Sequence, residues 1–144
     1  MSDGPRRLRS ATPTDRTVLR QLRDRLLTTR QVATARLTDG AGHLELLVTL
    51  SEDYHPTAEA TSTLTVRWYT NDDFSVHYQE ETADGNWECR WDRHPNPHDT
   101  REHFHPPPDA ETPGADRSWP KGYRDLLRHV LNDIEGRIEQ LWAE

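Results

Sequence analysis

Three things are scarce in this sequence: cysteine, lysine and long apolar runs. One cysteine, Cys89, among 144 residues excludes an internal disulfide. No stretch approaches the roughly 20 apolar residues that cross a bilayer, and no apolar segment follows the charged N-terminus as it would in a secretory signal. We therefore predict a cytoplasmic protein with no membrane partner.

Charge is plentiful but unbalanced. There are 25 Asp and Glu residues against 18 Lys and Arg, of which only Lys121 is lysine, and the formal net charge is −7. Arginine in place of lysine, with many carboxylates, is typical of salt-loving archaea, whose carboxylates hold water and whose net charge resists association. GC-biased codon use in an ordinary bacterium is the alternative. This charge is unsuited to coating nucleic acid broadly, which takes a basic face, but it is compatible with a local arginine-lined site.

Hydrophobic periodicity predicts a helix at each end of the chain and strands between them. A helix-start pattern at Thr12 precedes apolar residues at helical spacing as far as Thr29, and a longer apolar stripe follows Ser118 and Trp119. Alternation with a period of two marks five strands, at 32–37, 43–50, 61–69, 74–78 and 87–91.

This order of elements predicts an α+β fold. We expect a disordered tail at 1–11 and a single domain over 12–144, with a five-stranded antiparallel meander sheet flanked by an N-terminal and a C-terminal helix packed on one face. The segment 93–118 holds more than half of the ten prolines and shows no sustained period, so we predict an irregular, His- and Pro-rich loop there.

Alternation also divides the strand side chains between two faces. The apolar set should face the helices, and comprises Leu64, Val66, Trp68, Phe74, Val76, Tyr78, Trp87, Cys89 and Trp91. The opposite face then carries Arg67, His77, Gln79, Glu88, Arg90 and Asp92. Such a face is either a solvated surface with stabilising cross-strand Arg–Glu pairs or part of a functional site.

Half of the histidines lie in one short segment, between Arg90 and His105. The four are His94, His98, His103 and His105. Histidine pairs can cleave a phosphodiester because one neutral ring accepts a proton while a charged ring donates one. An arginine must then hold the charge that builds on the phosphate, and Arg90 and Arg93 are available. The segment therefore predicts an acid–base site.

Metal binding is a second interpretation of the same segment. His103 and His105 are two residues apart, so an extended chain puts both rings on one side. His94, His98 or Asp92 could complete a site for zinc or another divalent metal. The spacing matches no defined zinc-finger or zinc-protease pattern.

In a third interpretation the segment has no chemistry, because histidines in a proline-rich loop can cap turns and bond to the backbone.

The candidates outside this segment are weaker. We expect His43 and His55 at the surface, and Cys89 as a small hydrophobic residue of the core.

Several short motifs in this part of the chain resemble those of the TumE-like proteins. In order, they are His77-Tyr78-Gln79, Asp84-Gly85, Arg90-Trp91-Asp92, His94-Pro95 and His103-Phe104-His105. TumE-like proteins are small toxin halves of toxin–antitoxin pairs, and many are described only as domains of unknown function. The resemblance implies a toxin with an antitoxin partner, and it transfers best to Arg90, Asp92, His94 and His105.

The leading hypothesis is a toxin that cleaves RNA by metal-independent acid–base chemistry, with no required cofactor. The catalytic candidates are His77, Arg90, Asp92, His94, His98, His103 and His105, and the substrate-binding candidates are Arg67, Gln79 and Arg93. The expected partners are an RNA substrate and an antitoxin protein, and the C-terminal helix is a candidate surface for the antitoxin or for a homodimer. The alternative is a non-catalytic metal-binding or protein-interaction domain, with His94, His98, His103 and His105 as ligands.

Overall fold

The computed structural model of this protein describes residues 12–40, 42–94, 102–112 and 114–144. The predicted tail at 1–11 and His98 lie outside the described residues. The described helices are α2 (Arg16–Leu27) and α3 (Tyr123–Ala143). The described strands are β1 (Val32–Gly40), β2 (His43–Leu50), β3 (Thr61–Trp68), β4 (Phe74–Thr82), β5 (Gly85–Arg93), β6 (Glu102–His105) and β7 (Ala115–Asp116).

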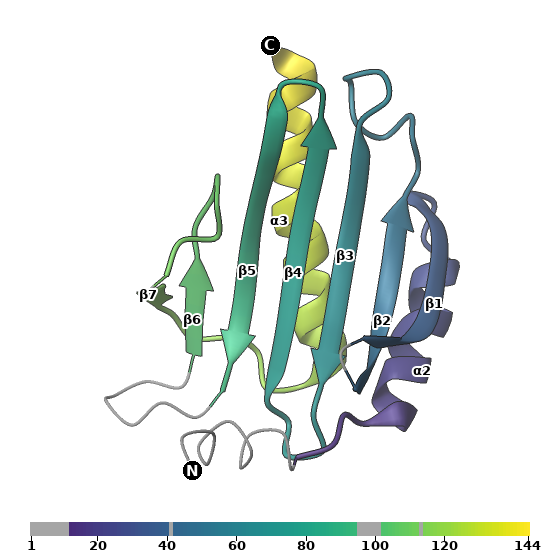
Figure 1. The fold of residues 1–144 in the computed structure, drawn as a ribbon, viewed down its shortest axis with the longest axis vertical. Helices are drawn as coiled ribbons and strands as arrows, with labels where there is room; N and C mark the ends of the chain where they lie inside the picture. The colour runs from purple at the N-terminus through teal and green to yellow at the C-terminus, as the bar shows by residue number, and fades with distance from the viewer. Residues whose placement is uncertain (1–11, 41, 95–101, 113) are drawn as a thin grey trace.

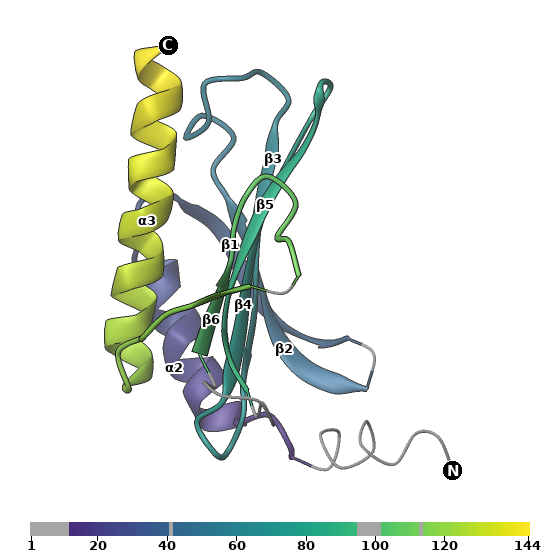
Figure 2. The ribbon, with the colours of Figure 1, turned by 90° about the vertical axis from the view of Figure 1, so that its left-hand side faces the viewer.

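The strands form one antiparallel sheet in which their spatial order follows the chain from β1 to β7 (Figure 1). Both helices pack on the same face of this sheet (Figure 2), so the α+β class, the antiparallel meander and the flanking helices are confirmed. Neither of the described helices is long and apolar enough to cross a membrane.

The prediction of five strands is wrong, because the described part of the proline-rich segment contributes β6 and β7. Phe104 is the one apolar residue of β6, and β7 has two residues, so neither shows the period that identifies a strand. The pairing of β6 with β5 is supported instead by tertiary packing. The Phe104 ring lies 5.7 Å from that of Trp91 and 6.3 Å from that of Trp119, measured between centroids.

Both helices begin later than the sequence predicts. Asp15 caps α2, because its Oδ1 accepts the N–H of Val18 at 3.1 Å, and the residues before it are extended and hydrogen-bonded to the end of β3. α3 begins after Gly122. In the segment before it, Trp119 is buried and its Nε1–H donates to the backbone oxygen of Asp92 at 3.0 Å. The predicted caps therefore lie in segments that hold the helices to the sheet.

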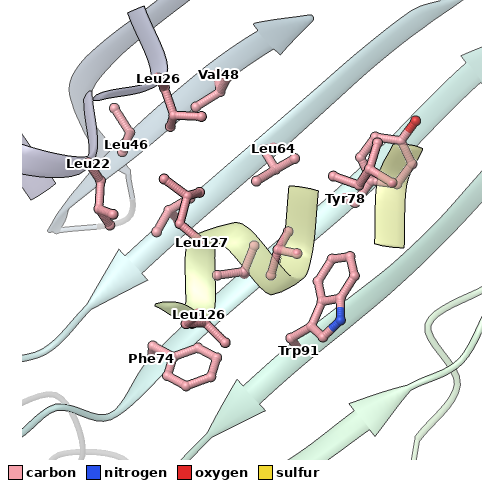
Figure 3. Packing of buried hydrophobic residues seen from close by; sticks show 14 of the residues in the cluster. Leu22, Leu26, Leu46, Val48, Leu64, Phe74, Tyr78, Trp91, Leu126 and Leu127 are labelled. Atoms are coloured by element: carbon pink, nitrogen blue, oxygen red, sulfur yellow. The ribbon is translucent and has the colours of Figure 1, made fainter. Parts of the chain in front are cut away.

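The hydrophobic core fills the space between the sheet and the two helices (Figure 3). Its fully buried members include Leu19, Leu26, Leu46, Val48, Leu64, Val66, Trp68, Phe74, Tyr78, Trp91, Leu126 and Val130. Trp68 and Phe74 stack with their centroids 5.1 Å apart. The predicted division of side chains between two faces is confirmed, except that Trp87 is only half-buried, with the guanidinium of Arg137 3.9 Å from its ring centroid.

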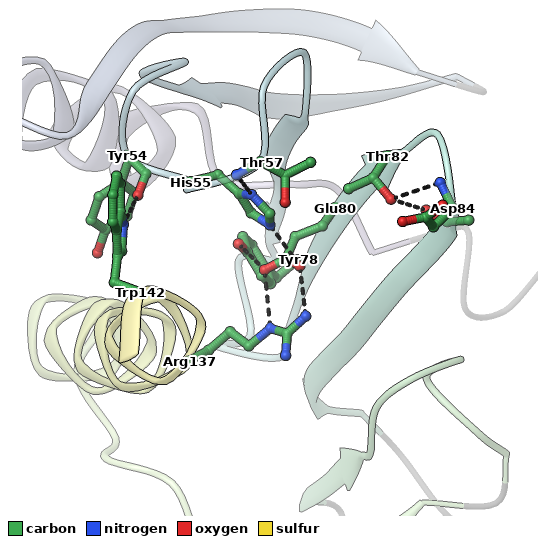
Figure 4. Close-up of polar contacts among 10 residues, drawn as sticks. Tyr54, His55, Thr57, Tyr78, Glu80, Thr82, Asp84, Arg137 and Trp142 are labelled. Atoms are coloured by element: carbon green, nitrogen blue, oxygen red, sulfur yellow. Dashed lines mark hydrogen bonds and ion pairs between the residues drawn. The ribbon is translucent and has the colours of Figure 1, made fainter. Parts of the chain in front are cut away.

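A buried carboxylate interrupts this apolar core. Glu80 is 1% exposed and accepts hydrogen bonds from the hydroxyl of Tyr78 at 2.7 Å and from Arg137 Nη2 at 2.9 Å (Figure 4). His55 Nδ1 accepts the N–H of Thr57, so its Nε2 carries the proton and faces Glu80 at 3.4 Å. The predicted surface position of His55 is therefore wrong, because the loop between β2 and β3 brings its ring to this charge.

Candidate functional site

Strand pairing brings together the chemistry-bearing residues of β5 and β6. Arg90 lies opposite His105, and Asp92 lies opposite His103. All four alternate with core residues such as Trp91, so their side chains share the face that the helices leave uncovered, which we call the open face. His94 follows β5 directly. We call these five residues the histidine cluster.

Asp92 is the centre of the histidine cluster. Its side chain is 4% exposed, and its Oδ2 accepts a hydrogen bond from Arg90 Nε at 3.0 Å. The same oxygen lies 2.9 Å from His105 Nε2 and 3.7 Å from His94 Nε2. One buried carboxylate oxygen therefore faces a guanidinium and two imidazoles, which concentrates charge at a single point.

The ring of His105 is held in place by contacts on its Nδ1 side. Its Nδ1 lies 3.0 Å from the backbone oxygen of Glu111, and its side chain is 6% exposed. Gly114 packs so closely on the ring that a Cβ at this position would come within 3.1 Å of two ring atoms. The turn between β6 and β7 therefore fixes the direction in which His105 Nε2 points, toward Asp92.

The other two imidazoles of the cluster differ in their access to solvent. His94 has a side chain that is 42% exposed. His103 is 9% exposed, and its Nε2 lies 3.9 Å from Asp116 Oδ1. The centroid of the His103 ring is 5.4 Å from that of His94 and 6.3 Å from that of His105. The described imidazoles of the segment thus converge, and His94 is the one that a large molecule can reach most easily.

A second histidine–carboxylate pair lies beside the histidine cluster. His77 Nε2 is 2.8 Å from Glu88 Oε1, with the two side chains 31% and 25% exposed. His77 lies opposite Arg90 in the β4–β5 pairing, and Gln79 lies opposite Glu88. Glu88 was assigned to this face by alternation but not to the predicted site. Arg90 therefore lies between the pair His77–Glu88 and the carboxylate of Asp92.

Arg67 lies on the same face, two strands away. It pairs with Ser75, which pairs with Asp92, so about 10 Å separates their backbones. Burial acts to lower the pKa of Arg67, but the hydrogen bond and charge of Glu45, whose Oε2 is 2.8 Å from Arg67 Nε, outweigh it and the pKa is raised. The guanidinium stays charged and half-exposed, within reach of an anion bound to this face.

One predicted substrate contact has a different position. Arg93 is two residues beyond Trp91, so it lies on the helix side of the sheet. Its guanidinium stacks 4.9 Å from the ring centroid of Phe74, and Nη2 donates to the backbone oxygen of Pro120 at 2.8 Å. These contacts give Arg93 a structural role, tying β5 to the segment before α3.

Sequence comparison places the chain in a family. The model of the family described as "Toxin TumE" matches residues 15–138, which is most of the chain. This chain belongs to the TumE toxin family. Neither curated proteins nor solved structures yield a match. The matched range contains both helices up to the last turns of α3, all described strands and the whole histidine cluster, so the family assignment and the site concern the same domain-sized unit.

The open face of this TumE-family protein offers two kinds of chemistry. Imidazoles beside carboxylates can transfer protons, and an arginine beside them can hold an anion. Alternatively, Asp92, His94 and His105 each present one ligand atom, and these three atoms all lie within 4.8 Å of one another, which is a separation that a single metal ion can bridge.

Proposed function

We propose that this TumE-family protein is the toxin half of a toxin–antitoxin pair and that it cleaves RNA by metal-independent acid–base chemistry on the open face. The observation that carries the proposal is the position of Arg90. It lies between two histidine–carboxylate pairs, His77 with Glu88 and His94 with Asp92. An acid, a base and a cation for the phosphate are the groups that cleavage of RNA requires.

The reaction uses the 2′-hydroxyl of RNA as the nucleophile. One neutral imidazole accepts the proton of that hydroxyl while its oxygen bonds to phosphorus. The bond from phosphorus to the 5′-oxygen breaks, and a protonated imidazole donates its proton to that leaving oxygen. The products are a 2′,3′-cyclic phosphate and a 5′-hydroxyl, and no water or metal is consumed. The guanidinium of Arg90 stabilises the negative charge on the non-bridging oxygens.

Solvent access supports this division of roles. The side chains of His77, His94 and Arg90 are each between 31% and 42% exposed, so a phosphate can contact them. Asp92 and His105 are almost fully buried and act through their neighbours, by orienting His94 and Arg90. A buried carboxylate next to an imidazole holds the ring in one orientation.

The remaining predicted residues have secondary places in this proposal. His103 borders the rings of His94 and His105 and limits their movement. Arg67 and Gln79 are proposed to contact neighbouring nucleotides of the RNA across the strands. His98 remains a proposed proton-transfer residue.

The test is cleavage of a single-stranded RNA by the untagged chain in the presence of a chelator. We expect a product that ends in a 2′,3′-cyclic phosphate, and no cleavage of the same sequence as DNA, which lacks the nucleophile. His94→Gln and His77→Gln should each reduce the rate by about 10²–10⁴-fold, which is the usual contribution of general acid–base catalysis. Expression without an antitoxin should arrest growth, and His94→Gln should relieve the arrest.

His129→Gln is the matched control, because this ring also pairs with a carboxylate, Asp133 at 3.3 Å, but lies on α3. It should cleave RNA at the rate of the unaltered protein. Circular dichroism of each variant separates loss of chemistry from loss of fold. Full activity in folded His94→Gln and His77→Gln proteins would refute the proposed site, and normal growth with abundant soluble protein would refute the toxin role.

A further inference from the structure

The ligand atoms of Asp92, His94 and His105 converge in a way that proton transfer alone does not explain. A carbonyl oxygen can only accept a hydrogen bond, so the contact with Glu111 O requires the proton of a neutral His105 to be on Nδ1. The Nε2 atom is then a lone pair that faces a carboxylate oxygen at 2.9 Å. Two lone pairs that face each other at this distance form a site that one cation can share.

The geometry at His105 Nε2 is not that of an ordinary hydrogen bond. Although Asp92 Oδ2 is only 2.9 Å away, Nε2 is buried and makes no aligned hydrogen bond to any of the described residues. Asp92 Oδ1 is buried and has no hydrogen-bond partner within the described part of the chain either. A metal ion satisfies lone pairs without needing the straight geometry of a hydrogen bond. Asp92 Oδ2 faces both imidazoles, so it can bind such an ion while it accepts the hydrogen bond from Arg90.

The distances between the ligand atoms agree with those expected around a small divalent ion. Bonds of about 2.0–2.1 Å at tetrahedral angles put ligand atoms roughly 3.4 Å apart. Asp92 Oδ2 is 2.9 Å from His105 Nε2 and 3.7 Å from His94 Nε2, and the ligand atoms of all three residues lie within 4.8 Å. The contact of His105 Nδ1 with a backbone carbonyl also fits, because a metal-binding imidazole usually donates its other ring N–H to such an oxygen, which orients the ring.

We propose that Asp92, His94 and His105 form a binding site for a divalent transition metal of the Zn²⁺ class. Two imidazoles and one carboxylate suit such borderline ions better than Mg²⁺ or Ca²⁺, which favour sites made of oxygen atoms. Three protein ligands leave a coordination position open toward the solvent side, where His94 is half-exposed. His103 is outside the ligand set, because among the described residues the ligand atoms of Asp92, His94 and His105 alone lie within 4.8 Å of one another.

The metal has a regulatory consequence that rests on the proposed function. Acid–base cleavage needs the His94 ring to gain and lose a proton, and a metal bound to the lone pair of Nε2 blocks that cycle. The metal-bound protein is therefore the inactive form, and removal of the ion restores proton transfer.

Binding is tested with the full chain, purified without a histidine tag and stripped with a chelator. Calorimetric titration with Zn²⁺ should give one ion per chain, and Co²⁺ should give the visible absorption of a low-coordinate nitrogen and oxygen site. His105→Ala and His94→Gln should each weaken Zn²⁺ binding at least about 100-fold. Each removes a residue that binds the metal directly, which costs more than the loss of a residue that only hydrogen-bonds to a ligand. His129→Gln, which changes a histidine on α3, should bind Zn²⁺ within a few-fold of the unaltered chain.

The outcomes separate the two proposals. No Zn²⁺ heat and no Co²⁺ spectrum, or binding that His94→Gln and His105→Ala leave intact in folded protein, overturns the metal site. Inhibition of RNA cleavage at the Zn²⁺ concentration that half-fills the site supports the regulatory role, whereas binding without inhibition overturns that role alone. A chain that binds Zn²⁺ but cleaves no RNA in either state refutes the proposed function and leaves the site standing. Cleavage that requires Zn²⁺ overturns both the inhibition and the metal-independent mechanism.

Discussion

The buried charge of Glu80 provides the most direct test of how this fold is held together. Its carboxylate accepts hydrogen bonds from Tyr78 and Arg137 and faces the protonated Nε2 of His55, so it joins β4, α3 and the loop before β3. Glu80→Gln keeps the shape of the side chain and removes its charge. Breaking a buried ion pair by neutralising one partner typically costs about 3–5 kcal/mol.

The cost should lie below that range here. The side chain of Arg137 is 23% exposed, so water can solvate part of the guanidinium after the substitution. We expect Glu80→Gln to lower the free energy of unfolding by about 2–3 kcal/mol. If the free energy of unfolding falls by about 2 kcal/mol for each molar of urea, the urea concentration at the midpoint of unfolding should fall by about 1–1.5 M. Tryptophan fluorescence and circular dichroism report this midpoint.

Two further variants make the result specific. Glu139→Gln removes an exposed charge from the same helix and should change stability by less than about 0.5 kcal/mol. The double variant Glu80→Met with Arg137→Met removes both charges but leaves the Tyr78 hydroxyl and the His55 Nε2–H without their acceptor, so it should be no more stable than Glu80→Gln. An unchanged midpoint for Glu80→Gln would refute the reasoning, as would a double variant with the stability of the unaltered chain.

Three other predictions follow from the same geometry. Burial, with the nearby carboxylates of Asp133 and Glu80, raises the pKa of the Cys89 thiol to about 12. Ellman's reagent at pH 8 should therefore label Cys89 only after unfolding, and rapid labelling of the folded protein would contradict the buried position of this residue. Gly114→Ala would put a Cβ 2.7 Å from the backbone oxygen of Phe104 and 3.1 Å from two atoms of the His105 ring, so it should displace that ring and reduce Zn²⁺ affinity and cleavage by about tenfold or more. Gly136→Ala, in an open position on α3, should stabilise the chain by about 0.4–1 kcal/mol without changing Zn²⁺ affinity, and an equal loss of affinity in both variants would contradict the packing. RNA affinity should fall only about sevenfold between 50 and 200 mM salt, because a single strand that contacts about two phosphate-binding arginines releases few counterions, and a loss of about a thousandfold would indicate a broad basic surface instead.

The strands and the division between their two faces were predictable from residues with strict alternation. Leu64, Val66 and Trp68 alternate with polar residues, and one face of each strand must be buried. β6 was not predictable in this way, because a four-residue strand with one apolar residue has no period. Its position depends on the contact of Phe104 with Trp91, which are adjacent only after β5 has formed.

The alternation of side chains along a strand also predicts the faces of Arg93 and Glu80, which the predicted site did not take into account. Arg93 is two residues from Trp91, so alternation already places it on the helix side, away from the other candidates. Glu80 is two residues from Tyr78, so it had to be a buried carboxylate in need of partners. No local pattern identifies His55 as one of those partners, because the loop that carries it has no period.

The register between β5 and β6 has a consequence for both proposed activities. Had the segment after β5 been an irregular loop, its histidines would have had independent positions and no fixed distance from Asp92. Pairing places Asp92 opposite His103 and Arg90 opposite His105, so both imidazoles are held by backbone hydrogen bonds on the face that carries the carboxylate. Metal binding uses His105 as a ligand, and proton transfer depends on His105 through Asp92, which orients His94. Both proposed activities therefore need this register, and they compete because Asp92 and His94 belong to both.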